Sequence, residues 1–290
     1  MKIFEVTYRY DGTDDMVRPQ PVDADAARAR LNEGSQSVVA LLDGVADGTG
    51  AVEHVVHVDP RDLGVDVGGR STPAQRPFAA VVGCSDARVP IELVFKEGPN
   101  DLFVVRVAGN GLGAEVLGSL RYAVDHLGDS LKLVVVLGHS GCGAVTAAVD
   151  AYLEPASYLS VAVNHALRGI LDRLLAVINA AARRMAEEFG PDVTRRPGYR
   201  TALIEAASVS HAALSAHTLQ RHLGDDGPQG LRAAYGTYLI DAHTVWAPRA
   251  GSADCTGLAY PPSDLAGFAG FADAVVRSER IRAILATPAP

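Results

Sequence analysis

The sequence has few cysteines, few aromatic residues and no surplus of basic residues. Three cysteines in 290 residues are too few for a disulfide framework, and they indicate a reducing compartment. The 26 lysines and arginines are outnumbered by 34 acidic residues, which gives a net charge of -8. This balance argues against a nucleic-acid partner, because such a partner requires a basic surface.

Long hydrophobic runs are also lacking. The longest, such as residues 131–138, are far shorter than the roughly 20 apolar residues that cross a bilayer. The first residues, 1–5, lead directly into polar sequence, without the apolar stretch and cleavage site of a signal peptide. We therefore expect a cytoplasmic protein with no membrane partner.

Hydrophobic residues make up 48% of the chain, which is enough for a substantial core. Continuous apolar runs at 78–83, 102–107 and 131–137 are typical of buried parallel strands. Helix-like segments at 91–96 and 113–127 lie between them, and Gly128 suits a C-terminal cap. Strands that alternate with helices predict an α/β fold with a mainly parallel central sheet flanked by helices.

The flanking sequence predicts an N-terminal helical arm and extra C-terminal helices. We interpret residues 1–290 as one domain, with an arm and connector at 1–74, a core at 75–150 and a helical insertion, edge strands and tail at 151–290. The outer elements are expected as helices at 22–42, 157–188, 201–223 and 271–285, and as strands at 3–10, 52–58, 234–240 and 244–246.

Two short runs of polar residues follow the first and third core strands. They are Cys84-Ser85-Asp86-Ala87-Arg88 and His139-Ser140-Gly141-Cys142. Parallel strands deliver the residues after their carboxyl ends to one edge of the sheet, so we expect these runs to meet. Two thiolates and one imidazole suit a tetrahedral zinc ion whose fourth position stays open.

Each of these residues also has a purely structural interpretation. Cys84 and Cys142 can be small buried apolar residues, and His139 can be a core histidine. Asp86 and Arg88 can form a salt bridge at a strand end. Because all of them occur together, we favour the zinc site, with Asp86 accepting a hydrogen bond from the nucleophile and Arg88 keeping Asp86 ionised.

The two runs, together with Val105-Arg106-x-Ala108-Gly109-Asn110, resemble the β-class carbonic anhydrases over residues 75–150. The resemblance implies that Zn²⁺ is bound by Cys84, His139 and Cys142, and that Asp86 and Arg88 form a catalytic dyad. Asp86 itself is a possible fourth ligand in a closed state. It also implies a homodimer or higher homo-oligomer, and substrate contacts from Gln75, Phe103, Tyr122 and the Gly143 N–H.

The activity implied by the resemblance is reversible hydration of carbon dioxide to bicarbonate and a proton by zinc-bound hydroxide. Two alternatives stay open at this point. Hydrolases of carbonyl sulfide and carbon disulfide share the scaffold, and a non-catalytic, zinc-stabilised interaction module would use the extra helices. In a closed state, activity would appear steeply as pH rises.

Several features depart from the family or carry no functional prediction. Ala87 replaces the usual serine, and the sequence after residue 150 is longer than usual. The glycines at 109–113 lack the spacing of a dinucleotide-binding loop. We interpret Cys255 as an idle thiol, and the three histidines of the 201–223 helix as surface or interface residues, namely His211, His217 and His222.

Overall fold

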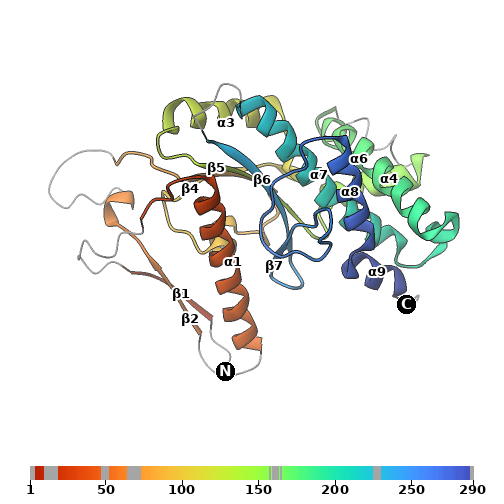
Figure 1. Cartoon of the computed structure of the whole chain (residues 1–290), viewed down its shortest axis with the longest axis horizontal. Helices are drawn as coiled ribbons and strands as arrows, with labels where there is room; N and C mark the ends of the chain where they lie inside the picture. Colours follow the sequence, from red (N-terminus) through yellow and green to blue (C-terminus); the bar gives the residue numbers. More distant parts are fainter. Residues whose placement is uncertain are drawn as a thin grey trace.

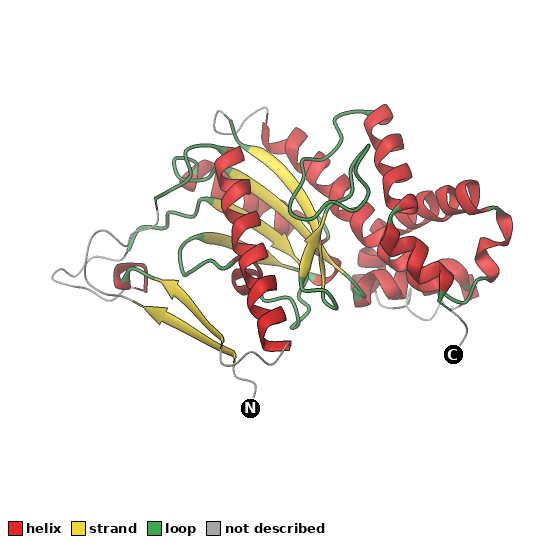
Figure 2. Ribbon diagram, turned by 60° about the horizontal axis from the view of Figure 1, so that its bottom comes forward, coloured by secondary structure: helices red, strands yellow, loops and turns green. Residues whose placement is uncertain are grey.

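A five-stranded sheet forms the centre of the molecule in the computed structural model, with strand order β4-β3-β5-β6-β7 (Figures 1 and 2). The model describes residues 4–9, 19–46, 52–63, 73–156, 158, 163, 165–224 and 230–287. The strands are β3 (Ala79–Gly83), β4 (Leu102–Arg106), β5 (Leu133–His139), β6 (Arg232–Leu239) and β7 (Thr244–Trp246). The first four are parallel, and β7 pairs antiparallel with β6. The predicted α/β class is confirmed.

Alternate residues of the central strands enter two separate cores. On β3, Ala80 and Val82 face one side of the sheet, while Ala79 and Val81 face the other. The first face is covered by helices α3 (Ala114–Leu127) and α7 (Tyr199–Gly224), with α4 (Gly143–Leu153) and α6 (His165–Phe189) packed beside α7. Cys84 continues the first series, so its side chain belongs to the core beneath α3 and α7.

The opposite face is covered by α1 (Ala24–Ala46) and the short helix α2 (Ile91–Phe95). Asp23 caps α1 by accepting the Ala26 N–H at 2.8 Å. At Gly34 an added Cβ would lie 1.9 Å from the Phe95 carbonyl oxygen, so only glycine lets the two helices approach this closely. The N-terminal helix is therefore part of the folded core and not a free arm.

Two short strands form a separate parallel pair, β1 (Phe4–Arg9) with β2 (Val52–His57), beside the 3-10 turn η2 (Pro60–Leu63). Figure 2 shows this pair beside α1, away from the central sheet. The side chains of His54 and Val56 on β2 are buried, whereas Tyr8 on β1 is exposed. The sequence predicted both strands but not their pairing, which joins segments about forty residues apart.

The C-terminal third adds a group of helices to the right of the sheet in Figure 1. The predicted helix at 201–223 is α7, and it is preceded by the 3-10 turn η4 (Pro191–Arg195). The predicted single helix at 271–285 is wrong, because the chain forms α8 (Leu265–Arg277) and α9 (Glu279–Ala286). Ser278 separates them: its backbone is extended, and its hydroxyl accepts the Ile281 N–H to cap α9.

Three smaller differences concern element ends. The helix predicted at 157–188 begins at His165, and most of residues 157–164 lie outside the described residues. Gly128 ends α3 in a right-handed conformation, so it is not the left-handed cap that a glycine there predicts. Strand β5 runs to His139 and thus carries the first residue of the second motif within the sheet.

In the part of the chain that is described, no helix combines the length and apolar character needed to cross a membrane.

Candidate metal centre

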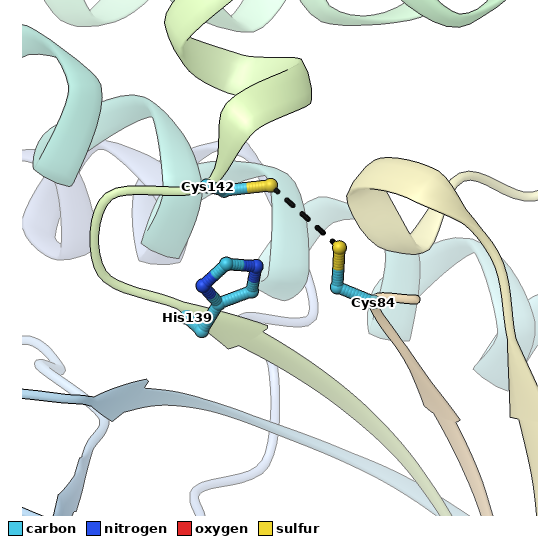
Figure 3. A group of neighbouring side chains, drawn as sticks. All are labelled: Cys84, His139 and Cys142. Carbon is cyan, nitrogen blue, oxygen red and sulfur yellow. Dashed lines mark hydrogen bonds between the residues drawn. The ribbon is translucent and has the colours of Figure 1, made fainter. Parts of the chain in front are cut away.

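The two motifs meet at the carboxyl edge of the sheet, as the parallel topology predicts. Gly83 pairs in register with Leu137, so Cys84 and His139 leave adjacent strands at nearly the same level. Cys142 is the N-cap residue of α4. The ligand atoms of Cys84, His139 and Cys142 all lie within 4.8 Å of one another, and all three residues are buried. Figure 3 shows the two sulfurs directed at each other, with the imidazole beside them.

The spacing and the donor set fit a zinc ion. The two sulfurs are 3.9 Å apart. Two thiolates on one tetrahedral zinc, at Zn–S distances of about 2.3 Å, are about 3.8 Å apart. Among the described residues, His139 Nε2 is buried and has no hydrogen-bond partner, while Nδ1 lies 3.0 Å from the Ser140 carbonyl oxygen. That contact sets the tautomer, with Nδ1 donating and Nε2 free to bind a metal.

The sulfur pair is held partly ionised without a metal. A hydrogen bond from the Cys142 thiol lowers the pKa of Cys84 against the opposing effect of burial, with further help from His139 and the Gly109 N–H. The contact with Cys84, followed by burial, raises the pKa of Cys142. A metal ion that binds both sulfurs as thiolates would displace any proton they share.

Asp86 and Arg88 form a two-pronged ion pair next to this group. Arg88 Nε donates to Asp86 Oδ1 at 3.0 Å, and Nη2 donates to Oδ2 at 2.7 Å. The Arg88 backbone N–H donates to the same carboxylate at 2.9 Å. The hydrogen bonds from the Arg88 side chain hold the pKa of Asp86 well below its usual range. Asp86 Oδ2 also lies 3.9 Å from His139 Nε2, so an ionised carboxylate borders the candidate metal position.

The third family segment, residues 105–110, supports the first motif from the neighbouring strand. The Arg106 guanidinium donates to the backbone carbonyls of Cys84 at 3.0 Å and Asp86 at 2.5 Å. The Gly109 N–H points at the Cys84 sulfur at 3.4 Å. Gly109 has a φ of 66°, and an added Cβ would lie 3.0 Å from the Ala144 Cβ, so glycine is required there.

Comparison with known proteins assigns the family. A family model described as carbonic anhydrase matches residues 79–221. A carbonic anhydrase of Mycolicibacterium smegmatis is 35% identical over 176 residues, which cover 57% of this chain and 84% of that protein. The chain belongs to the carbonic anhydrase family. The resemblance to the β class is confirmed, and the chain is a carbonic anhydrase enzyme by family.

Two further proteins are similar to parts of this chain. Carbonic anhydrase 2 of Mycobacterium tuberculosis is 43% identical over 100 residues, which cover 33% of this chain and 47% of that protein. A tetrameric β-carbonic anhydrase from Sordaria macrospora has 20% identity and a TM-score of 0.46, over 73% of this chain and 91% of that chain. Helices α8 and α9 lie beyond the residues that match the family model.

The carbonic anhydrase fold places the substrate residues suggested by sequence in two different regions. Gly143 directly follows Cys142 at the start of α4, and open space lies where a side chain would begin. Gln75 and Phe103 instead line a hollow of about 330 Å³ at the amino end of the strands. Gln75 also lines a neighbouring hollow with His126, on whose ring Tyr122 stacks at 4.5 Å.

Within one chain, Gln75 is remote from the metal cluster. Gln75 precedes β3, whereas Cys84 follows it, and the strand between them spans about 16 Å at ~3.3 Å per residue. Gln75 is exposed, and Tyr122 is 49% exposed. The structure therefore brings together Cys84, Asp86, Arg88, His139, Cys142 and Gly143. It places Gln75 and Phe103 in a separate hollow and Tyr122 exposed against His126.

Sequence reasoning missed two side chains that contact or approach this centre. Glu205 of α7 is only 4% exposed and accepts the Gly141 N–H at 3.2 Å. An acidic residue within an otherwise Ala-rich, buried helix was the available signal. The interpretation of His211 as a surface or interface residue is wrong: it is 6% exposed, and burial lowers its pKa to about 4 despite hydrogen bonding to the backbone of Gly109 and Asn110.

Proposed function

We propose that the chain catalyses the reversible hydration of carbon dioxide to bicarbonate and a proton, with a zinc ion held by Cys84, His139 and Cys142. One observation carries the proposal. Two cysteine sulfurs and an unpartnered histidine nitrogen converge at a spacing suited to zinc, beside an ionised carboxylate at the same sheet edge. Membership of the carbonic anhydrase family supports the same reaction.

The roles of the residues follow from their chemistry. Zinc, when bound, supplies the Lewis acidity that makes a water molecule nucleophilic near neutral pH. Asp86 accepts a hydrogen bond from the nucleophile at a carboxylate oxygen, which turns a lone pair toward the carbon of the substrate. Arg88 occupies both Asp86 oxygens and keeps the carboxylate ionised and oriented. The Gly143 N–H, next to Cys142, donates to a substrate oxygen.

The test is CO₂ hydration followed by stopped-flow with a pH indicator, on protein that metal analysis shows to hold zinc. We expect a rate well above buffer at pH 8.5. A rate equal to that of buffer, on zinc-loaded protein, would refute the proposal. Release of sulfide from carbonyl sulfide or carbon disulfide at a higher kcat/KM would assign the site to those substrates instead.

We also propose that the site is completed by a second copy of the chain. Gln75 and Phe103 line a hollow at the amino ends of the strands, and Tyr122 stacks on His126, which lines a second hollow with Gln75. Gln75 precedes the strand that Cys84 follows, so it lies far from the metal ligands of its own chain. An exposed tyrosine and a half-buried phenylalanine are suited to contact another subunit. The relative from Sordaria macrospora is described as tetrameric, which supports assembly of this chain as well.

Complementation between one impaired and one inactive variant tests this arrangement. A Gln75→Ala homodimer should lose about tenfold in kcat/KM, the effect of one hydrogen bond of about 1.4 kcal/mol, and a His139→Ala homodimer should be inactive. In a heterodimer purified with two different affinity tags, Gln75 from the His139→Ala chain serves the intact metal site. We expect about half of wild-type activity per dimer. If Gln75 acted in its own chain, activity would stay near one twentieth.

A further inference from the structure

The loop that carries His139 and Cys142 is held by hydrogen bonds from more than one element. The Ser140 N–H donates to the Tyr238 carbonyl at 2.9 Å, and the Ser140 hydroxyl accepts the Ile240 N–H at 2.9 Å. Both contacts come from the end of β6, the strand next to β5. They fix the first half of the loop, because Ser140 directly follows His139. The second half depends on a different element.

Gly141 is the turning point of the loop, one residue before Cys142. Its φ of 60° lies in the left-handed region, where neighbouring hydrogen bonds must define the backbone because glycine itself does not. Its N–H is bound by Glu205 Oε1 of α7 at 3.2 Å. The Glu205 side chain is 5% exposed, so the carboxylate that sets this turn lies inside the protein.

A buried carboxylate requires a cation, and α9 supplies it. Arg280 Nε donates to Glu205 Oε2 at 3.0 Å, the oxygen that Gly141 does not use. The two terminal nitrogens of Arg280 donate to Asp241, just after β6, at 3.1 and 3.2 Å. Arg280 thus joins the C-terminal helix, the end of β6 and the residue that orients the metal loop.

These contacts lead from the protein surface to the metal loop. Asp241 is exposed and anchors the Arg280 guanidinium, and Arg280, with a side chain 19% exposed, fixes one oxygen of Glu205. The other Glu205 oxygen then points at the Gly141 N–H. Arg280 lies outside the residues that match the family model.

We propose that Arg280 is a positioning residue for the metal centre: through Glu205 it holds the Gly141 turn so that Cys142 and His139 converge. The proposal rests on the zinc site inferred above. Partners that orient metal ligands from outside the ligand set typically change metal affinity by about 10–100-fold. The extra C-terminal helices would then serve to keep zinc in place.

The test compares Arg280→Ala with Arg282→Ala, which removes an exposed arginine from the same helix. We expect Arg280→Ala to speed transfer of zinc to a chromogenic chelator by about tenfold. It should also shift the visible absorption of the Co²⁺-substituted protein, because the thiolate geometry changes. Arg282→Ala should leave both measurements at the wild-type values. Arg280→Lys keeps the charge but not both carboxylate contacts, so its zinc release and Co²⁺ spectrum should lie between those of the wild type and Arg280→Ala. It also provides the test if Arg280→Ala does not fold.

Repeating the Arg280→Ala substitution in a Glu205→Ala chain distinguishes a positioning role of Arg280 from a general effect on stability. Removing a buried ion-pair partner destabilises proteins in any case, so a lower melting temperature alone proves nothing. In a Glu205→Ala chain, Arg280→Ala should cause no further increase in zinc release, because the connection to Gly141 is already broken. Equal acceleration in both backgrounds, or unchanged zinc release and Co²⁺ spectrum in Arg280→Ala, would overturn the proposal. A wild-type chain that takes up no zinc would overturn the zinc site itself.

Discussion

Replacing His139 with alanine is expected to leave a folded chain that has lost its zinc and its CO₂ hydration. His139 offers the nitrogen ligand of the group, with Nε2 unpartnered among the described residues. Loss of a partner outside the ligand set already costs about 10–100-fold in affinity, so loss of a ligand should cost more than about 100-fold. Metal analysis after gel filtration and stopped-flow hydration measure the two effects.

The matched control is His222→Ala, which removes an exposed histidine from the last turn of α7. It should keep one equivalent of zinc per chain and wild-type kcat/KM. Circular dichroism should show that the His139 variant keeps its helices, because β5 is held in the sheet by backbone pairing with β3 and β6, which alanine at position 139 retains. A His139→Ala protein with a full equivalent of zinc would show that the ligands have been assigned wrongly.

The cluster of Cys84, His139 and Cys142 could be predicted from the sequence because Cys84 directly follows a buried strand, His139 ends another, and Cys142 lies three residues further on. A continuous apolar run, a parallel sheet and the rule that strand ends share an edge are sufficient to bring Cys84 and His139 together. The ion pair between Asp86 and Arg88 was predictable for a related reason. The two residues are separated by one position, so the geometry of a single turn decides their contact.

The supporting residues could not be predicted, because their roles depend on packing between distant segments. Glu205 meets Gly141 across 64 residues, and Arg280 meets Glu205 across 75. Nothing local in α7 or α9 specifies these contacts. The break at Ser278 was missed for a different reason: apolar residues continue at helical spacing through it, and only the capping hydrogen bond separates α8 from α9.

The proposed roles of Gln75, Phe103 and Tyr122 depend on how subunits assemble, which is a level of structure beyond the single chain. The resemblance implies a substrate-lining role for them, but a single chain holds Gln75 and Phe103 in a hollow at the amino ends of the strands, with Tyr122 stacked on His126. A family pattern carries no information on which subunit supplies a residue to which site. The complementation experiment addresses that question, since it distinguishes a residue that acts in its own chain from one that acts in a second copy.

Asp86→Asn is the second variant with a large expected effect, and here activity should be lost while zinc is kept. Asparagine has the size of aspartate but no charge, so it cannot accept from both Arg88 nitrogens and the nucleophile as a carboxylate does. Groups that orient or move a proton in the reaction contribute about 10²–10⁴-fold. We expect kcat/KM for CO₂ hydration to fall by about 10²–10³-fold, measured by stopped-flow on protein with verified zinc content.

Stability should change little in this variant, because 59% of the Arg88 side chain is accessible and solvent screens its attraction to Asp86. The control is Asp125→Asn, which breaks the exposed Arg121–Asp125 pair of α3 and should leave kcat/KM unchanged. Wild-type kcat/KM in Asp86→Asn would show that Asp86 does not orient the nucleophile. Loss of zinc together with activity would instead make Asp86 a metal ligand, as in the closed state. Only retained zinc with lost activity agrees with Asp86 orienting the nucleophile.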